Sequence, residues 1–458
     1  MTLTECRKLF CGKQCTVLGI GVSNRPLVDF LLECGAVVTA RDKKEPSALG
    51  ESADAFSAAG VRLITGADYL ANIRADYLFR SPGIRPDKKE ILDAVANGAV
   101  LLSEMELFCA LCPCPIFGIT GSDGKTTTTT LVALLLEAAG KRVFLGGNIG
   151  TPLLPLVKEM TPDDYAVVEL SSFQLMTIGN GPARAAITNL SPNHLDWHTG
   201  MEEYVESKCR IFGGENCRTV VLNAENEGTA AIADRLDAAG GKRVCRFSSA
   251  RILSGEGDVY EKDGVICRGR EAILPTDAIL LPGRHNVENY MTAIAMVGDL
   301  VPAAAIRSVA KTFPGVEHRI EFVREKDGVR FYNSSIDSTP SRTAAALRCF
   351  PERLIVICGG YDKHIPFGPL GEVLCEKAKT VVLTGATRDA IRASIEEASA
   401  VTKPQILTEP DFDMAVAAAA KSAESGDIVI LSPGCASFDA FPNFAVRGER
   451  FKQIVGNL

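Results

Sequence analysis

Short apolar runs alternate along most of the chain with longer stretches in which apolar residues recur every three or four positions. The first run, residues 15–20, precedes a predicted helix at 26–34 and a second predicted strand at 36–40. Further short strands are predicted at 77–79 and 100–101. Strands that alternate with helices are typical of a parallel sheet covered by helices. The pattern therefore predicts an α/β protein.

The same pattern begins anew at two later points. After residues 112–115 we predict a strand at 116–120, a glycine loop at 121–124, a helix at 126–139, strands at 143–145, 166–170, 185–189 and 219–223, hairpins in 254–270 and a helix at 285–297. After residues 314–319 we predict strands at 329–332, 354–358, 380–383 and 428–431. We therefore expect three α/β domains, covering residues 1–112, 113–315 and 316–458.

Length and charge narrow the class of protein. A chain of 458 residues exceeds what one ordinary core holds. The formal net charge of −7 indicates no general surface for nucleic acid or an anionic membrane, although local basic sites can still bind phosphates. No apolar run reaches the length of a membrane span, and residues 1–9 contain no signal-peptide core. We expect a cytoplasmic monomer that binds no nucleic acid and does not insert into a membrane.

The chain contains 15 cysteines, which in a reducing compartment are interpreted mostly as small buried hydrophobic residues. Cys109, Cys112 and Cys114 come closest to a metal-binding pattern, but no second ligand pair follows at a zinc-finger spacing, and Pro113 and Pro115 interrupt the cluster. The pattern favours no metal site there, and the role of the cluster is left open.

The strongest local signal is the segment Gly121-Ser122-Asp123-Gly124-Lys125-Thr126, between a predicted strand and a predicted helix. Glycines allow backbone N–H groups to close on phosphate oxygens at a helix N-terminus. In such loops the lysine reaches the β- and γ-phosphates, and the hydroxyl after it binds Mg²⁺. The position of the first glycine holds Ile119 instead. The alternative is a glycine turn that precedes a lysine by chance, which the flanking strand and helix disfavour.

A second glycine pattern lies near the N-terminus. Gly19 and Gly21, with Asp42 about twenty residues on, are typical of a dinucleotide-binding fingerprint. The third glycine position holds Asn24, which argues against the close helix–strand approach of an NAD site. An NAD-dependent oxidoreductase is therefore an alternative that the first domain alone supports weakly.

Further motifs follow in a fixed order along the chain. They are GITGSDGKTT at 118–127, GGNIG at 146–150, ELSSFQ at 169–174, NHLDWH at 193–198, YVESKCRI at 204–211, GRHNVEN at 283–289, HRIE at 318–321, GGYDK at 359–363 and SPGCASFDAFPNFAVRG at 432–448. The loop resembles that of the Mur ligases and folylpolyglutamate synthetases. ELSSFQ, GGYDK and the C-terminal block resemble the D-glutamate-adding branch of the Mur ligases.

The resemblance implies a fold and a reaction. The fold is a Rossmann-like UDP-binding domain, a central P-loop ATPase domain and a C-terminal Rossmann-like domain, with a hinge near Gly315. The reaction uses ATP and two Mg²⁺ to add D-glutamate to UDP-N-acetylmuramoyl-L-alanine through an acyl phosphate, in peptidoglycan precursor synthesis and hence in cell shape and division. The alternatives within the resemblance are another Mur ligase, a folylpolyglutamate synthetase and a catalytically silent scaffold.

The resemblance also implies site residues. Catalytic and metal-binding roles fall to Lys125, Thr126, Glu169, His194 and Lys208, the last as a carbamate, because a free ammonium does not suit a cation site. ATP contacts fall to Gly121, Ser122, Asp123, Gly124, Lys125, Thr126, Thr127, Asn289, Arg319 and Asp337. Contacts to the UDP substrate fall to Val22, Ser23, Asp42, Lys43, Ser81, Pro82, Gly83 and Asn148. D-Glutamate contacts fall to Lys363, Ser437, Phe438 and Phe444.

One segment departs from the family pattern. The Mur ligases usually carry Asp-Ser-Lys early in the third domain, whereas this chain has Asn333-Ser334-Ser335-Ile336-Asp337. An ungapped match puts Ser334 at the acid and Ile336 at the lysine. We expect Asp337 to supply the acid near the ATP ribose. Arg342 is a candidate for the lysine role, which is otherwise unfilled.

Overall fold

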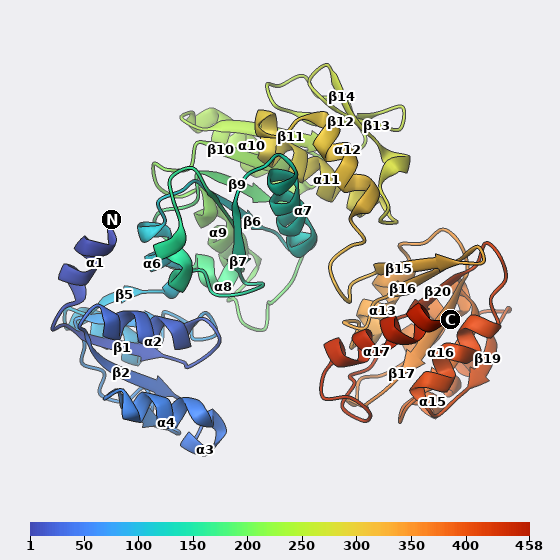
Figure 1. Cartoon of the computed structure of the whole chain (residues 1–458), viewed down its shortest axis with the longest axis horizontal. Helices are drawn as coiled ribbons and strands as arrows, with labels where there is room; N and C mark the ends of the chain where they lie inside the picture. Colours follow the sequence, from blue (N-terminus) through green and yellow to red (C-terminus); the bar gives the residue numbers. More distant parts are fainter. The chain divides into compact units, whose positions relative to one another are not determined.

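The computed structural model describes the backbone of residues 1–458 and all side chains except those of Glu51 and Ser52 (Figure 1). Its strands form three sheets of 5, 9 and 6 strands with helices between them, so the predicted α/β class is confirmed. The chain divides into two compact units, Met1–Thr276 with Glu288–Val309 and Asp277–Val287 with Ala310–Leu458. The first two sheets belong to the first unit and the third sheet to the second. The domain boundaries at 112/113 and 315/316 stay a prediction.

The first sheet is parallel and has the order β3-β2-β1-β4-β5. Its strands are β1 Gln14–Leu18, β2 Val37–Asp42, β3 Arg62–Thr65, β4 Tyr77–Arg80 and β5 Val100–Leu102. Its helices are α1 Leu3–Phe10, α2 Asn24–Glu33, α3 Pro46–Leu49, α4 Glu51–Ala58, α5 Lys89–Ala96 and α6 Glu104–Leu111. The strand order reverses at β1, and ligand sites of open α/β sheets form at such a reversal.

The end of β1 and the start of α2 differ from the prediction, which ended the strand at residue 20 and began the helix at residue 26. β1 ends at Leu18 because Gly19 adopts φ +81°, a conformation that breaks the strand. α2 begins at Asn24, whose side-chain amide donates to the carbonyl oxygens of Leu18 (3.2 Å) and Gly19 (2.9 Å). Asn24 therefore joins strand and helix by hydrogen bonds at the position where a dinucleotide fingerprint has a third glycine.

The second sheet has the order β14-β13-β12-β11-β10-β9-β6-β8-β7. Its strands are β6 Ile116–Thr120, β7 Val143–Gly147, β8 Tyr165–Glu169, β9 Arg184–Ile187, β10 Thr219–Asn223, β11 Arg243–Ser248, β12 Val259–Lys262, β13 Val265–Arg268 and β14 Glu271–Pro275. Strands β12 and β13 pair antiparallel, which confirms a hairpin in the predicted segment 254–270, and β14 pairs antiparallel with β13 just beyond it. The helices are α7 Lys125–Ala138, α8 Ser172–Leu175, α9 Met201–Cys209, α10 Glu227–Ala239, α11 Arg284–Val297 and α12 Ala303–Thr312.

Helix α7 carries the phosphate-binding loop and begins with a run of threonines. Such β-branched residues are mediocre helix formers. Here the hydroxyls of Thr129 and Thr130 donate to the carbonyl oxygens of Lys125 (2.8 Å) and Thr126 (2.9 Å), one turn back. Farther along, Leu131 and Leu135 are fully buried and anchor the helix. The functional first turn is thus fixed both by its own side chains and by the core.

The third sheet has the order β15-β16-β20-β17-β18-β19. Its strands are β15 Glu321–Lys326, β16 Val329–Asn333, β17 Leu354–Gly359, β18 Ala378–Thr384, β19 Gln405–Thr408 and β20 Ile428–Leu431. Its helices are α13 Pro340–Leu347, α14 Gly368–Lys377, α15 Arg388–Glu397, α16 Phe412–Lys421 and α17 Phe444–Asn457. Only β15 pairs antiparallel with its neighbour, so the carboxyl ends of the other strands share one edge.

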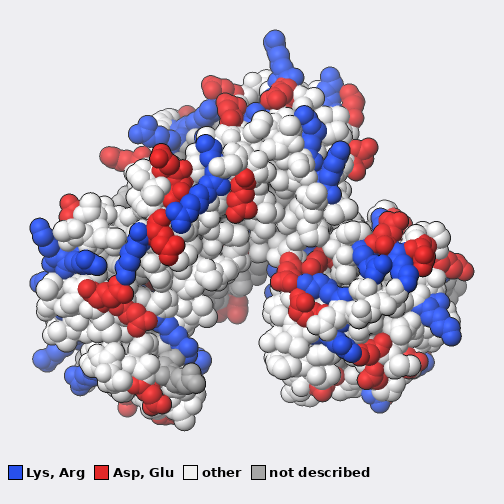
Figure 2. Space-filling view, viewed as in Figure 1, with Lys and Arg blue, Asp and Glu red and all other residues white. Residues whose placement is uncertain are grey.

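Surface charge is mixed. On the face shown in Figure 2, acidic and basic side chains are interspersed over the surface. Among the described residues, no helix combines the length and the apolar character that crossing a membrane requires.

Candidate active site

The phosphate-binding loop has the predicted position, between β6 and α7. Gly124 adopts φ +77°, and a Cβ there would lie 2.4 Å from Oδ1 of Asn289, so only glycine fits. Nζ of Lys125 donates to the carbonyl oxygens of Gly121 (3.0 Å) and Ser122 (2.9 Å). The Lys125 ammonium is therefore hydrogen-bonded to its own loop, which ends at the N-terminus of α7. A cation and helix N–H groups together form a site for phosphate oxygens.

The segment after β9 holds this loop from behind. The Ser122 hydroxyl donates to the carbonyl oxygen of Ser191 (3.0 Å) and contacts the Tyr204 hydroxyl (2.9 Å). The backbone N–H of Asp123 donates to Oδ1 of Asn189 (2.9 Å). These bonds fix the conformation of the loop.

Two oxygen-bearing side chains meet beside the loop. Oγ1 of Thr126 donates to Oε2 of Glu169 (2.7 Å), and Nδ2 of Asn148 donates to Oε1 of the same carboxylate (2.7 Å). Glu169, at the end of β8, is only 2% exposed. A hydroxyl and an oriented carboxylate suit Mg²⁺, which prefers oxygen ligands. The predicted metal residues Thr126 and Glu169 are thus brought together, and Asn148 orients the carboxylate.

Lys208, on α9, is buried behind the same loop. Its Nζ donates to the Gly121 carbonyl oxygen (2.8 Å) and to Oγ1 of Thr120 (3.3 Å), and it lies 4.6 Å from the centre of the Tyr204 ring. Burial, and next the positive charge of Lys125, lower the pKa of Lys208 to about 7. A large fraction of Lys208 is therefore an uncharged amine at neutral pH, and only that form reacts with CO₂.

The two histidines of NHLDWH have different surroundings. His194 is exposed, adopts φ +54° and contacts the Phe173 ring edge-on at 5.0 Å. Partial burial and the charges of Lys125 and Lys208 lower its pKa, so its ring is available as a neutral metal ligand. His198 is buried, with Nε2 2.9 Å from the Ser172 hydroxyl. The buried His198 ring is therefore held by a hydrogen bond, whereas the exposed His194 ring can reach a metal ion.

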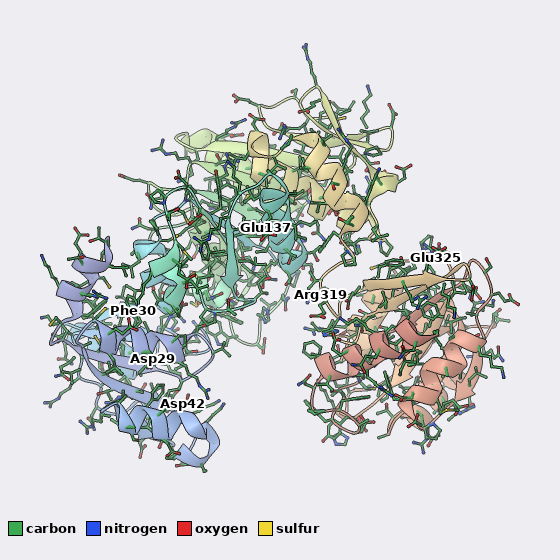
Figure 3. All side chains as sticks on the ribbon, viewed as in Figure 1. Asp29, Phe30, Asp42, Glu137, Arg319 and Glu325 are labelled. Carbon is green, nitrogen blue, oxygen red and sulfur yellow. The ribbon has the colours of Figure 1, made fainter. Side chains whose placement is uncertain are left out.

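The residues expected to contact UDP gather at the carboxyl edge of the first sheet, after β1, β2 and β4. Asp42, labelled in Figure 3, accepts the N–H groups of Ile20 (2.6 Å) and Lys44 (2.9 Å). Val22 is 75% exposed, and a Cβ on Gly19 would lie 2.8 Å from Cβ of Ser81. The remaining predicted residues, Ser23, Lys43, Pro82 and Gly83, belong to the same three loops. These loops form one continuous edge.

In the second unit, Asp337 is buried and accepts the Ser432 hydroxyl (2.8 Å). Burial raises the pKa of Asp337 to about 6. Nζ of Lys363 lies 3.4 Å from the Ser338 hydroxyl, and Nη1 of Arg342 donates to the Ile336 carbonyl oxygen (3.4 Å). Arg319 is exposed in the segment that leads into β15 (Figure 3). Nζ of Lys363 thus lies beside Ser338, the residue that follows Asp337.

The expected D-glutamate residues of the C-terminal block surround the start of α17. Ser437 is 2% exposed, whereas Phe438 is 63% exposed and contacts the ring of Tyr361 at 5.9 Å. The carbonyl oxygen of Phe444 accepts the Ser335 hydroxyl (2.8 Å). The block is therefore hydrogen-bonded to the segment in which the family pattern departs.

Sequence reasoning assigned no role to Arg447, although it is part of the C-terminal motif. Arg447 is 2% exposed and donates to the carbonyl oxygens of Ser335 (2.9 Å), Cys435 (3.1 Å) and Ala436 (3.0 Å). Its Nε also donates to the Ser335 hydroxyl (3.0 Å). This single guanidinium joins α17, the segment after β16 and the segment after β20.

Two other clusters have no place in this site. Sγ of Cys112 lies 3.4 Å from Sγ of Cys114 and 3.8 Å from Sδ of Met160. Among the described residues, the group of His, Cys, Asp and Glu side chains close enough to share a cation is Glu317, His318 and Glu449. Lys452 already pairs with Glu317 (2.5 Å) and with Glu449 (2.6 Å), so an ammonium balances these carboxylates.

A P-loop beside a buried carboxylate and a buried lysine is the arrangement of an ATP-dependent ligase, and comparison with known proteins agrees. The sequence model of the Mur ligase middle domain matches residues 119–297, and that of the Mur ligase glutamate ligase domain matches residues 318–435. The chain belongs to the Mur ligase family.

The similar curated proteins extend over the whole chain. A UDP-N-acetylmuramoylalanine--D-glutamate ligase of Clostridium novyi (strain NT) is 46% identical, over 100% of this chain and 99% of that protein. One of Clostridium perfringens (strain 13 / Type A) is 44% identical over 99% of each. Among solved structures, the UDP-N-acetylmuramate-alanine ligase of Thermotoga maritima has a TM-score of 0.57 at 18% identity, covering 97% of this chain and 99% of that one. This structural likeness supports the fold.

Proposed function

We propose that the chain adds D-glutamate to UDP-N-acetylmuramoyl-L-alanine at the expense of ATP, in peptidoglycan precursor synthesis. The observation that carries the proposal is the full-length similarity, 46% identity, to a ligase of that name. The Thr126–Glu169 pair and the buried Lys208 beside the phosphate-binding loop supply the groups that such a reaction needs. ATP and the UDP substrate are cytoplasmic, so we place the proposed activity in the cytoplasm. We propose that the chain acts as a monomer, with all site residues supplied by one chain.

The reaction has two steps. The alanine carboxylate of the UDP substrate attacks the γ-phosphorus of ATP, so that an acyl phosphate forms and ADP leaves. The amine of D-glutamate then attacks the acyl carbon, the amide forms, and phosphate leaves with the electron pair of the broken C–O bond. The amine's proton passes to solvent or base. Negative charge gathers on crowded oxygens in the first step, so catalysis depends on cations placed in advance.

The phosphate-binding loop receives the ATP phosphates in this proposal. Lys125, already turned onto the loop, neutralises charge on the β- and γ-phosphates, and the N–H groups of residues 121–127 donate hydrogen bonds to the remaining phosphate oxygens. Asn289, against Gly124, contacts the adenine side. Arg319 and Asp337 of the second unit contribute to the phosphate and ribose contacts, respectively.

Two Mg²⁺ would neutralise the reacting oxygens. Thr126 and Glu169 would hold the first, because their oxygens lie 2.7 Å apart. His194 and carbamylated Lys208 would hold the second. The carbamate forms when the neutral Lys208 amine attacks CO₂ and releases a proton, and it turns a buried base into an anionic oxygen ligand.

In this proposal the UDP substrate and D-glutamate bind to different sets of residues. The loops of Val22, Ser23, Asp42, Lys43 and Ser81–Gly83 hold the UDP moiety, and Asn148 the muramoyl part. Lys363, Ser437, Phe438 and Phe444 hold D-glutamate, whose two carboxylates require a cation and directed donors.

Phosphate release from ATP tests the proposal. The assay contains UDP-N-acetylmuramoyl-L-alanine, Mg²⁺ and one amino acid at a time: D-glutamate, L-glutamate, D-aspartate or meso-diaminopimelate, with product mass measured. We expect release that requires both the UDP substrate and D-glutamate. Turnover only with a folate or a longer UDP-peptide would contradict the substrate assignment, and binding of NADH would revive the oxidoreductase alternative.

A further inference from the structure

The loop after β4 is fixed at both ends by arginines that reach the central sheet's site. Arg80 is 1% exposed, and its guanidinium donates to the carbonyl oxygens of Ile84 (3.0 Å) and Phe173 (2.7 Å). Phe173 belongs to α8, directly after the Glu169 segment. Residues 81–83, the proposed UDP wall, therefore lie on a loop whose first end is bonded to α8.

The other end of the loop is bonded to α9. Nη2 of Arg85 lies 2.8 Å from Oε1 of Glu203, Nη1 lies 3.1 Å from Oε2, and Nη1 also donates to the Trp197 carbonyl oxygen (2.6 Å). The side chains of Arg85 and Glu203 are 20% and 24% exposed, respectively. Such a two-pronged guanidinium–carboxylate pair fixes geometry as well as charge. Asp87 binds the same guanidinium from the outside, with its side chain 56% exposed.

Glu203 continues the connection inward. Its Oε2 also accepts the N–H of Thr199 (2.9 Å) and lies 3.1 Å from Nδ1 of His198. The bonds from Arg85 lower the pKa of Glu203 to about 2, so Glu203 accepts only. Nδ1 of His198 must then donate. Burial lowers the pKa of His198, and the neutral ring leaves Nε2 to accept the Ser172 hydroxyl (2.9 Å).

This series of bonds ends at the proposed metal-binding residues. The backbone N–H of His198 donates to the carbonyl oxygen of His194 (3.0 Å), so the two histidines share one turn. Phe173 contacts the rings of His194 (5.0 Å), Trp197 (4.4 Å) and His198 (5.6 Å). A shift of Arg85 therefore reaches the turn that carries His194.

We propose that Arg85 and Glu203 are positioning residues, through which the UDP-substrate loop 81–83 sets the place of the His194 turn. The inference rests on the proposed function and deepens it: occupancy of the UDP site and readiness of the metal site are linked. Neither residue touches reacting atoms in this proposal. Their effect is to fix the distance between the UDP end of the substrate and the end that is phosphorylated.

The chain carries its own reporter for this link. Trp197 is its single tryptophan, and the Arg85 guanidinium lies 5.0 Å from the centre of the Trp197 ring. The experiment compares the parent chain with Arg85→Gln, Glu203→Gln and the matched control Asp87→Asn. UDP-N-acetylmuramoyl-L-alanine is added without ATP, its affinity is measured by calorimetry, and Trp197 emission is excited at the red edge, where uridine does not absorb. The kcat and KM for the same substrate are then measured.

We expect substrate binding to change Trp197 emission in the parent and in Asp87→Asn. In Arg85→Gln and Glu203→Gln the affinity is little changed, the emission response is lost, and kcat falls by about 10–100-fold, as for groups that orient metal ligands. If Arg85 and Glu203 only stabilise the fold, the kcat of both variants should instead return to the parent value when the assay is run far below their melting temperatures. Glu203→Gln carries the test if Arg85→Gln does not fold.

The outcomes separate the two proposals. Absence of amide formation by the parent chain would overturn the proposed function. Parent turnover with Arg85→Gln and Glu203→Gln matching Asp87→Asn in kcat and emission response would overturn the positioning role alone. Recovery of kcat on cooling would do the same.

Discussion

Nζ of Lys208 lies 2.8 Å from the carbonyl oxygen of Gly121, so a buried amine supports the phosphate-binding loop from within. Lys208 is 2% exposed and has Lys125, a second cation, as its main charged neighbour. Its protonated form is therefore disfavoured. A carbamate at this position would replace a repelled cation by an anion.

The first prediction concerns CO₂. Lys208→Arg carries a permanent positive charge and forms no carbamate. Because groups that merely orient metal ligands are worth about 10–100-fold, we expect a loss of at least about 100-fold in kcat. Removing CO₂ from the buffer should slow the parent chain, and bicarbonate should restore it. Phosphate release measures both effects, and NMR with isotope-labelled bicarbonate detects the carbamate. Lys141→Arg, at an exposed lysine, is the control. Full activity of Lys208→Arg would refute the modification.

The second prediction concerns Asn148. Because its amide holds Oε1 of Glu169 at 2.7 Å, Asn148→Ala should free the carboxylate to rotate. We expect the Mg²⁺ concentration for half-maximal activity to rise about 10–100-fold. A Mg²⁺ titration of ATP turnover at saturating substrates measures this. Asn97→Ala, at an exposed asparagine in the first sheet's domain, should behave as the parent. An unchanged Mg²⁺ requirement in Asn148→Ala would show that the amide does not orient the metal ligand.

The third prediction concerns Asp337 and pH. Burial raises its pKa from 3.8 to about 6, so between these values the folded chain holds a proton that the unfolded chain has released. The free energy of unfolding therefore falls as pH rises through this window. Asp337→Asn removes that loss, so its stability relative to the parent should rise between about pH 4 and 7. Denaturant unfolding at several pH values measures the difference. Asp327→Asn, at an exposed turn, is the control.

The fourth prediction concerns Arg447. Arg447→Met keeps the volume but leaves the buried carbonyl oxygens of Ser335, Cys435 and Ala436 without this donor. We expect the second unit to lose stability by at least about 1–3 kcal/mol, the cost of one unsatisfied buried group. KM for D-glutamate should rise more than KM for the UDP substrate, since the segment of Ser437 loosens. Thermal melting and steady-state kinetics measure these effects, with exposed Arg450→Met as the control. Equal changes in both KM values would contradict this placement.

The sequence predicted the phosphate-binding loop, because its residues are contiguous in the chain. A strand, four residues and a helix start place Lys125 and Thr126 on one loop, so the phosphate site could be predicted from residues 116–126. The strands that were not predicted are β3, β11, β14, β15 and β19, and all but β11 lie at sheet edges. An edge strand has one partner and an exposed side, so its apolar run is short. In β15 a bulge between Phe322 and Arg324 also breaks the alternation.

The sequence by itself determined the α/β class, the phosphate loop and the family, since these depend on short-range patterns and on motif order. Only the tertiary structure decided which side chains meet. Asn148 lies against Glu169 from 21 positions away, and Arg85 reaches Glu203 across 118. Arg447 reaches Ser335 across 112. Asn148 and Glu169 meet because the parallel strands β7 and β8 end at the same edge of one sheet. Arg85 and Glu203 belong to segments of two different sheets. In each case burial and a shared hydrogen bond, rather than any local pattern, select the partner.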